Sequence, residues 1–209
     1  MSLLVRMAIP LNAKQLTIDS YNTHAAELAE RYDKLDRRGA IEWTLEPLTK
    51  KHPFVFEIGC GSGRDAKEFL KHTSHYIGVD LSEALLAFAK RNVPEATFLH
   101  ADIETMELPE QIDLVYSSAS LLHTNKQRFQ SILERLRSKL TPGGLVYLSL
   151  KESDQYREEM QIDRFGSRVF YHYSLQDIQE MSSGFQILKE RHLKHERDII
   201  WLEVLLQKV

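Results

Sequence analysis

Three glycines at alternate positions form the stretch of the chain best suited to hold a ligand. Gly59, Gly61 and Gly63 follow a short apolar run, 54–58, whose one acid is Glu57. Glycine permits positive φ and carries no Cβ, so a turn of this kind lets the backbone close on a small ligand at the end of a strand. A helical pattern starts after Gly63, and the free N–H groups of a helix N-terminus attract an anionic part of such a ligand. The spacing therefore predicts a ligand-binding turn between a strand and a helix.

The same spacing excludes two common nucleotide-binding loops. A dinucleotide-binding turn needs its third glycine at the position of Arg64, and a phosphate-binding loop needs lysine followed by serine or threonine after Gly63. Cys60, inside the turn, is expected to be a small filler residue that borders the ligand and is not a nucleophile. A plain glycine turn is the alternative interpretation.

Two acids follow the next two apolar runs. Asp80 ends the run 75–80, and Asp102 comes directly after the run 97–101. Asp80 follows Gly63 at close to the offset of about 20 residues at which an acid binds the hydroxyls of a ribose. A helix cap for Asp80 and a solvated turn acid for Asp102 are the alternatives.

Apolar runs alternate with helical patterns along the middle of the chain. Strands are expected at 54–58, 75–80, 97–101, 112–117 and 145–150. Among the helices between them, 83–91 is capped by Ser82, and another opens with Thr124 and Gln127 as a capping box. Strands that alternate with helices form a parallel sheet covered on both faces, so the fold class is α/β with a doubly wound sheet.

The two ends of the chain show different patterns. Residues 1–18 are expected to be a loosely held lead-in, before helices from Ser20 to about Leu35 and over 41–50. The polar stretch 151–168 is expected to be a long connection, followed by a short helix capped by Ser174. The runs 185–188 and 199–206, separated by the charged stretch 189–198, are expected to pair as an antiparallel hairpin at a sheet edge.

Composition sets limits on the class of protein. The 209 residues suit one domain, with 43% hydrophobic and 27% charged residues. A net charge of −3 argues against a strongly phosphate-driven nucleic-acid binder. The single cysteine fits a reducing cytoplasm, the first residues do not show the pattern of a signal peptide, and no apolar run reaches membrane-spanning length. The nine histidines lack metal-ligand spacing, so no metal is expected; the oligomeric state is not indicated.

Four motifs now stand in order along the chain. They are Glu57-x-Gly-x-Gly-x-Gly63, Gly78-Val79-Asp80, Ala101-Asp102 and Pro142-Gly143-Gly144. With the closing hairpin, they resemble the class I S-adenosylmethionine-dependent methyltransferases over residues 40–208. Gly63-Arg64-Asp65-Ala66 and the stretches 119–123, 148–151 and 168–174 resemble a branch of small, stand-alone bacterial enzymes of this family.

The resemblance implies a fold and a division of the chain. It implies a Rossmann-like, seven-stranded sheet that is mostly parallel, with the last strand antiparallel. Residues 1–209 then form a single domain. Its parts are an N-terminal helical lid (19–50), a cofactor-binding core (54–150) and an acceptor-side segment with the closing hairpin (151–209).

The resemblance also implies S-adenosylmethionine as cofactor and S-adenosylhomocysteine as product. Asp80 would bind the ribose, and Asp102 the adenine amino group, with Ile103 beneath the ring. Glu57 would lie beside the cofactor's amine. The other residues expected around the cofactor are Gly59, Cys60, Gly61, Gly63, Arg64, Leu81, Ser118 and Tyr21. Arg64 would pair with the methionine carboxylate or with Asp65, or be a surface arginine.

The acceptor side is less well marked. Methyl transfer from a sulfonium needs alignment, and needs a base only for a hydroxyl or a protonated amine. His123, just past the fourth strand, is the candidate base, with simple packing as the alternative. Tyr171, His172 and Tyr173 are candidates for the acceptor wall. Lys151 and Arg168 are candidates to attract an anionic substrate, with solvated surface charge as the default interpretation.

Three functions remain open from the sequence. The first is a methyltransferase that acts on a small molecule, because almost nothing lies beyond the catalytic domain. The second is a tRNA methyltransferase for a modified wobble uridine, with phosphate contacts from Lys189, Arg191, Lys194 and Arg197. The third is a catalytically silent domain that binds the cofactor or a partner.

Overall fold

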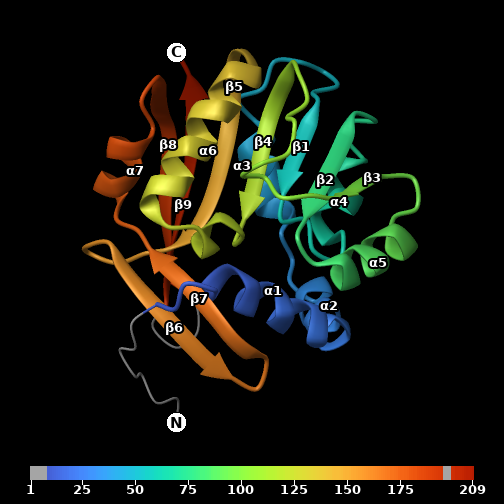
Figure 1. Ribbon diagram of the computed structural model, residues 1–209. Coiled ribbons are helices and arrows are strands. Elements are labelled where there is room, and N and C mark those ends of the chain that lie inside the picture. Colours follow the sequence, from blue (N-terminus) through green and yellow to red (C-terminus); the bar gives the residue numbers. More distant parts are fainter. Residues whose placement is uncertain (1–8, 195–198) are drawn as a thin grey trace.

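The computed structural model describes residues 9–194 and 199–209. Arg197 and the first eight residues of the expected lead-in lie outside these ranges. A seven-stranded sheet runs through the molecule in the order β3-β2-β1-β4-β5-β9-β8 (Figure 1). Its strands are β1 (Val55–Ile58), β2 (Tyr76–Asp80), β3 (Thr97–His100), β4 (Ile112–Ser118), β5 (Leu140–Lys151), β8 (Phe185–Lys194) and β9 (Ile200–Lys208).

The strand directions confirm the expected fold class. β1 pairs in parallel with both β2 and β4, and β5 continues the parallel set beside β4. β9 runs antiparallel to β5 and to β8, so the last strand is inserted against the direction of its neighbours. The expected closing hairpin is therefore present at one edge of the sheet.

Helices cover both faces of the sheet. They are α1 (Ala13–Thr23), α2 (Ala25–Asp33), α3 (Arg38–Leu45), α4 (Arg64–Phe69), α5 (Glu83–Asn92), α6 (Lys126–Lys139) and α7 (Leu175–Met181), with the short 3₁₀ helix η1 (Leu121–His123). Alternate strand residues enter two different cores, because successive side chains of a strand point to opposite faces. Phe56 packs into the core on the α6 side, and its neighbour Val55 into the core on the α4 side.

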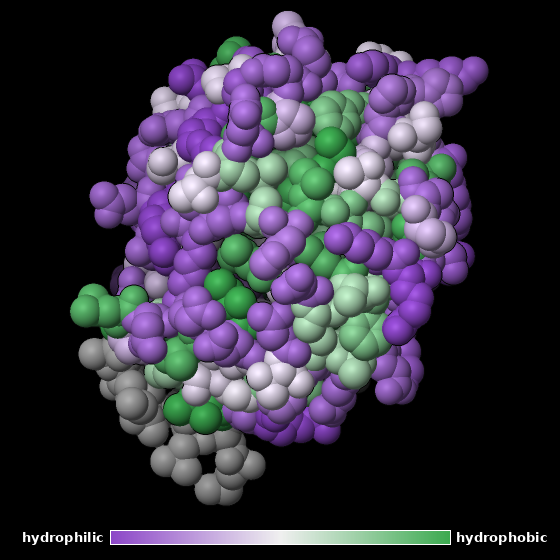
Figure 2. Space-filling model, turned by 45° about the vertical axis from the view of Figure 1, so that its right-hand side comes forward, coloured by the Kyte–Doolittle hydropathy of each residue, from purple (hydrophilic) through white to green (hydrophobic). Residues whose placement is uncertain are grey.

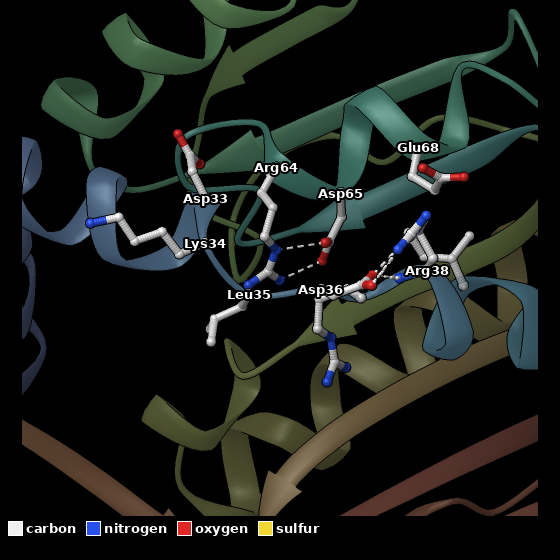
Figure 3. Close-up of a pocket in the computed structure, with 10 residues that line it drawn as sticks. Asp33, Lys34, Leu35, Asp36, Arg38, Arg64, Asp65 and Glu68 are labelled. Carbon is white, nitrogen blue, oxygen red and sulfur yellow. Dashed lines mark hydrogen bonds and ion pairs between the residues drawn. The ribbon is translucent and has the colours of Figure 1, made fainter.

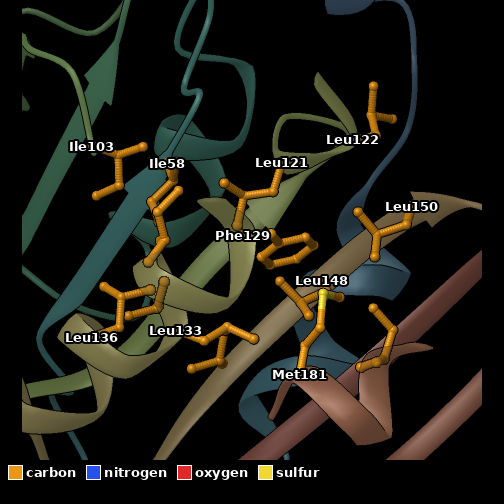
Figure 4. Packing of buried hydrophobic residues seen from close by; sticks show 14 of the residues in the cluster. Ile58, Ile103, Leu121, Leu122, Phe129, Leu133, Leu136, Leu148, Leu150 and Met181 are labelled. Carbon is orange, nitrogen blue, oxygen red and sulfur yellow. The ribbon is translucent and has the colours of Figure 1, made fainter. Parts of the chain in front are cut away.

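The core on the α6 side lies between the sheet and the helices α6 and α7. Leu133 and Leu136 of α6 meet Ile58 and Leu148 of the sheet, and Met181 of α7 closes the same layer (Figure 4). On the other face, α3, α4 and α5 contribute Ile41, Phe69 and Leu86 to the second core. Figure 2 brings forward the side of the molecule that carries α5 and β3. Hydrophobic residues gather there in a band that is bordered by hydrophilic ones.

The expectation of a long polar connection over 151–168 is wrong. β6 (Arg157–Asp163) and β7 (Gly166–His172) form a separate antiparallel hairpin in this region. The turn between them is closed by Asp163, whose Oδ1 accepts from the N–H of Phe165, and by Gly166 with φ +91°. β6 is half-buried or exposed along its length, so its sequence lacks the apolar alternation by which strands are recognised.

Several boundaries also differ from the prediction. The expected helix from Ser20 is instead α1 and α2, which meet at His24, and α1 begins at Ala13 inside the expected lead-in. α3 spans Arg38–Leu45, not 41–50. β8 continues to Lys194 through the charged stretch, since alternate residues there are half-covered.

Two further signals are corrected at helix ends and strand starts. The cap of α6 is Asn125, whose side chain accepts from the N–H of Arg128, and Thr124 instead ends η1. The expected capping box of Thr124 and Gln127 is therefore wrong. β5 begins at Leu140, so the Pro-Gly-Gly motif lies within the range of the strand and does not precede it. The caps expected at Ser82 and Ser174 are confirmed.

Candidate functional site

The glycine turn joins β1 to α4 at the carboxyl edge of the sheet. Gly59, Gly61 and Gly63 all have positive φ, which glycine adopts without strain. A Cβ at Gly59 would come within 2.0 Å of Oγ of Ser120, whereas a Cβ at Gly61 would meet no atom within 4 Å. The turn is therefore packed against the fourth strand's loop at one end and open at its middle, where a ligand can approach the backbone.

Asp80 ends β2 directly beside the open part of this turn. Its Oδ2 accepts from the N–H of Gly61 at 2.8 Å, and its Oδ1 accepts from the N–H of Ser82 at 2.7 Å. Each carboxylate oxygen can accept more than one hydrogen bond, so both retain capacity for a hydroxyl pair. Burial raises the pKa of Asp80, against the opposing effect of these N–H groups. Leu81 follows it at the surface of the same edge, half-buried.

Glu57 lies beneath the turn and is 2% exposed. The hydroxyl of Tyr76 donates to its Oε2. Burial, together with the nearby charge of Asp65, raises the pKa of Glu57. Cys60 is also buried, and burial raises the pKa of its thiol, which fits a filler residue better than a nucleophile.

Asp102 is bound by a residue that sequence reasoning did not find. Nζ of Lys14, from α1, lies 2.5 Å from Oδ2 of Asp102 and 2.7 Å from Oε1 of Glu104. Ile103 between these acids is buried, and its carbonyl accepts from Arg135 at 2.5 Å. The Lys14 ammonium therefore makes to Asp102 the kind of donor contact that the resemblance assigns to an adenine amino group. No signal pointed to Lys14, because the start of α1 was expected to be irregular.

Arg64 is paired with its neighbour. Its Nε and Nη2 donate to the two carboxylate oxygens of Asp65, each at 2.7 Å. Of the alternatives expected for Arg64, the structure therefore shows the pairing with Asp65. Both residues line a hollow of about 330 Å³ between α4 and the segment that joins α2 to α3 (Figure 3). Its lining is mostly charged, with acids and bases in balance, and includes Asp33, Asp36, Arg37 and Arg38. Asp80 and Asp102 do not line it.

His123 lies past the end of β4, where Ser118 closes the strand. Its Nδ1 is 2.5 Å from the carbonyl oxygen of Val169, and its Nε2 is 2.9 Å from the hydroxyl of Tyr21. A carbonyl only accepts, so Nδ1 carries the proton, and Nε2 accepts from Tyr21. Burial lowers the pKa of His123 to about 3, so the imidazole is neutral at physiological pH. Burial likewise raises the pKa of Tyr21 well above its usual value.

Phe170 and four neighbouring side chains form what we call the Phe170 cluster: Tyr21, His123, Lys151, Arg168 and Phe170. The centroid of the Phe170 ring is 4.7 Å from the His123 ring, 3.4 Å from Nζ of Lys151 and 5.6 Å from the guanidinium carbon of Arg168. Arg168 also lies over the Tyr21 ring, at 5.8 Å. α1, η1, β5 and β7 each supply part of the cluster. Phe170 was missed as a site residue, although it lies between Arg168 and His172 on the same face of β7.

Lys151 and Arg168 are buried, with 8% and 6% exposure. The default interpretation of these residues as solvated surface charge is therefore wrong. The β7 hairpin covers them, and no sequence signal marked that hairpin.

The three candidates for the acceptor wall divide between two faces of β7. His172 is buried and points toward β6, where its Nε2 lies 2.8 Å from Glu159. Tyr171 stacks on Tyr156 on the opposite face. Tyr173 is fully buried, donates to the carbonyl of Thr124 and packs against Phe129, in the core on the α6 side. Tyr171 and Tyr173 are thus not brought to the Phe170 cluster.

Helix α1 connects the acids that follow β2 and β3 with the Phe170 cluster. Thr17 accepts from the N–H of Val169 at 3.1 Å, and Ser20 donates to the carbonyl of Ser167 at 2.9 Å, which ties α1 to β7. On the other side, Oδ1 of Asn22 accepts from the Ser82 hydroxyl at 2.8 Å. Helix α1 therefore lies across the carboxyl edge of the sheet, from the acids of β2 and β3 to the Phe170 cluster.

The described residues contain neither a metal-binding cluster nor a membrane-spanning helix. Over 9–194 and 199–209, no group of three or more histidine, cysteine or acidic side chains is arranged to hold a metal ion. Over the same ranges, no helix has the length and apolar character to span a bilayer.

A family model described as "Methyltransferase domain" matches residues 55–144. Trans-aconitate 2-methyltransferase of Variovorax paradoxus is 30% identical over 135 residues, which is 63% of this chain and 50% of that protein. Malonyl-[acyl-carrier protein] O-methyltransferase of Bacillus cereus is 30% identical over 150 residues, which is 69% of this chain and 47% of that protein. The chain thus spans about half the length of the curated relatives it matches.

Solved structures share the fold at lower identity. A 1,6-didemethyltoxoflavin-N1-methyltransferase from Burkholderia thailandensis, bound to S-adenosylhomocysteine, superposes with a TM-score of 0.77 at 16% identity, over 100% of this chain and 94% of that one. Magnesium protoporphyrin IX methyltransferase from Synechocystis PCC 6803, with bound S-adenosylmethionine, gives 0.73 at 16% identity, over 97% and 100%. These likenesses concern the fold.

Proposed function

The chain belongs to the class I S-adenosylmethionine-dependent methyltransferases, and on that premise we propose that it transfers the methyl group of S-adenosylmethionine to a small-molecule acceptor. The observation that supports this most is the position of Asp80. Its carboxylate accepts a hydrogen bond from the N–H of Gly61 at 2.8 Å. The residue expected to bind the ribose therefore lies next to the open middle of the glycine turn. When bound, the cofactor supplies an electrophilic methyl group on a charged sulfur.

The residues at the carboxyl edge fit the parts of this cofactor. Asp80 retains acceptor capacity for the ribose hydroxyls, and the carboxylate of Asp102 would accept from the adenine amino group once Lys14 withdraws. Gly59, Gly61 and Gly63 leave the backbone accessible, and Ser118 stands at the end of the neighbouring strand. Glu57 supports the turn from below. These assignments are parts of the proposal.

The chain's contribution to the reaction is alignment and exclusion of water. An in-line displacement at a sulfonium needs the acceptor held on the far side of the methyl group, in a site from which water is excluded. We assign the lid to the N-terminal helices. The expected lid of 19–50 is extended to Ala13, because α1 carries Lys14, Thr17 and Tyr21 onto the site. Residues 54–150 would hold the cofactor and 151–209 the acceptor.

His123 remains the candidate catalytic residue for an acceptor that must lose a proton. In this arrangement its Nε2 already accepts from Tyr21, so it would act through the Tyr21 hydroxyl or after Tyr21 withdraws. Such a role requires the closed helix α1 to shift.

The proposal of a small acceptor draws support from the relatives. Trans-aconitate, named for the relative from Variovorax paradoxus, is a small molecule. No relative reported above has tRNA in its name, so the tRNA alternative gains no support. Of the basic residues proposed to bind phosphates, Lys189 pairs with Glu46, and Arg191 lies 2.5 Å from the buried Glu203. A cytoplasmic location belongs to the same proposal and is supported by the single free thiol of Cys60.

Calorimetric titration with S-adenosylmethionine and S-adenosylhomocysteine tests the proposal. We expect micromolar binding to the wild type, and on the order of tenfold weaker binding to Asp80→Asn, which keeps the shape of the side chain but loses a charged acceptor. Glu95→Ala is the matched control, since Glu95 is an exposed acid just before β3, at the amino ends of the parallel strands. Folded protein that binds neither ligand would contradict the proposal and favour a silent domain.

A further inference from the structure

The positive charge of the Phe170 cluster is not matched by the protein. Within the part of the chain that the structure describes, Nζ of Lys151 has no hydrogen-bond or ion-pair partner, and its contact is the face of the Phe170 ring. Arg168 donates from Nη2 to Asp163 at 2.6 Å, but its buried Nε has no partner. Both cations are more than nine-tenths buried, and only Arg168 has a closely bound acid.

The other charged groups near Lys151 do not change this balance. Glu159 of β6 attracts the Lys151 charge, but it lies 2.8 Å from His172 and 3.6 Å from Arg157, so it is shared with two other basic side chains. Leaving buried donors and buried charge without partners is costly, so a bound ligand that supplies an acceptor to these groups would be stabilised by them. The unmet donors are of the kind that binds a carboxylate, because Arg and Lys together offer several N–H groups to its two oxygens.

The same cluster offers no free proton acceptor in the closed arrangement. Nε2 of His123 accepts from Tyr21, and Nδ1 donates to Val169. Burial keeps the imidazole neutral and the Tyr21 phenol protonated. An acceptor with an O–H or N–H group would need a base, whereas a carboxylate is already a nucleophile at neutral pH.

We propose that the acceptor is a small carboxylate, held between Lys151 and Arg168, and that its own oxygen takes the methyl group. This inference rests on the proposed methyltransferase function. A carboxylate oxygen forms a bond to the methyl carbon while the carbon–sulfur bond breaks and leaves its electron pair on sulfur. The products are a neutral methyl ester and S-adenosylhomocysteine, and no proton is released. The ester no longer carries the charge that the two cations bind, which favours its release.

The product distinguishes this reaction from other methylations. S-adenosylmethionine labelled in the methyl group is incubated with the protein and either a panel of short aliphatic mono-, di- and tricarboxylic acids or the acidic fraction of a bacterial small-molecule extract. Alkali hydrolyses a methyl ester and releases volatile labelled methanol, whereas methyl ethers and methylamines keep the label. We expect alkali-labile label, and none with the corresponding primary amides.

Lys151→Met tests the role of the cation. Methionine is similar in length and uncharged, so the variant should fold and bind S-adenosylmethionine as the wild type does. We expect the KM for the carboxylate to rise tenfold or more. Lys151→Arg should retain much of the activity. Lys51→Met is the matched control, because Lys51 is an exposed lysine before β1, at the amino ends of the parallel strands.

The pH dependence separates binding from base catalysis. Burial lowers the pKa of Lys151 to about 8 among the charges of Arg157, Glu159 and Asp163 from the β6 strand, and Arg168 from β7; His123 of η1 faces it as a neutral group. Lys151 is charged below that pH, so we expect the KM for the carboxylate to rise as the pH increases through about 8, and this change to vanish in Lys151→Met. Activity that instead rises through pH 8 would assign Lys151 as a base and overturn the proposal.

Failure here is distinct from failure of the proposed function. A protein that binds S-adenosylmethionine and transfers its methyl group only into alkali-stable products would keep the methyltransferase function and overturn the carboxylate acceptor. Binding of the cofactor without alkali-labile label from the panel or the acidic fraction would overturn it as well. Absence of cofactor binding would instead contradict the proposed function itself.

Discussion

At the scale of single residues, burial decides what His123 can do. A histidine in water has a pKa near 6.5, but His123 is enclosed by Tyr21, Phe170 and the backbone of Val169, with two cations nearby. Desolvation of the imidazolium is the largest cause of its lowered pKa. The residue is therefore a neutral hydrogen-bonding group that joins η1 to α1 and β7.

This pKa predicts a pH dependence of stability. The unfolded chain binds a proton at His123 below about pH 6.5, and the folded chain does so only near pH 3, so the unfolded state is favoured as the pH falls between these values. From pH 7 to pH 5 the group should reduce the free energy of unfolding by about 2 kcal/mol.

Urea denaturation at both pH values measures this loss. His123→Gln, which does not titrate, should lose about 2 kcal/mol less than the wild type over the same interval. Equal losses in the two proteins would show that His123 is protonated in the folded state near its ordinary pKa. Lys51→Met should behave as the wild type, since Lys51 is exposed.

At the scale of elements, polar contacts tie helix α1 to both sides of the candidate site. Its hydrogen bonds run to β7 through Thr17 and Ser20, and to the start of α5 through Asn22. Lys14 is about one-third exposed and binds both Asp102 and Glu104. Partly exposed ion pairs contribute little net stability, so an exchange of partners at Asp102 is inexpensive.

We expect Lys14→Ala to strengthen the binding of S-adenosylmethionine by a few-fold. Removal of the ammonium frees Asp102 for the adenine amino group, so the cofactor no longer has to displace it. Calorimetry on the variant and on Lys90→Ala, an exposed lysine of α5, measures the difference. Weaker binding to Lys14→Ala would show that Lys14 helps to hold the cofactor and that α1 stays closed around it.

At the scale of the whole molecule, the sequence predicted the central sheet because local and global signals agree there. β1 and β4 are buried and mostly apolar, and the glycine turn, Asp80 and Asp102 fall at or just after the ends of β1, β2 and β3. The alternation of strands and helices along the chain predicted the doubly wound architecture, which the strand order β3-β2-β1-β4-β5-β9-β8 confirms. The positions of the residues that we propose to bind the cofactor were therefore largely predictable.

The acceptor half was not predictable because tertiary contacts create it. β6 is polar and only half-covered, so its strand character comes from pairing with β7 and not from an apolar pattern. Lys151 and Arg168 were expected in solvent, since charged side chains are seldom buried, and only the β7 strand and α1 together enclose them. Lys14 reaches Asp102 from a helix that begins at Ala13, inside the stretch that was expected to be a loosely held lead-in.

Methyl transfer itself tests the account most directly. The protein is incubated with methyl-labelled S-adenosylmethionine and a small-molecule extract, and in parallel with total tRNA, with Asp80→Asn as the control. The account predicts that label passes into low-molecular-weight compounds, with S-adenosylhomocysteine formed in equal amount, and that Asp80→Asn lowers the rate at limiting cofactor. Label that enters tRNA alone, or no transfer by protein that is shown to be folded, would contradict it.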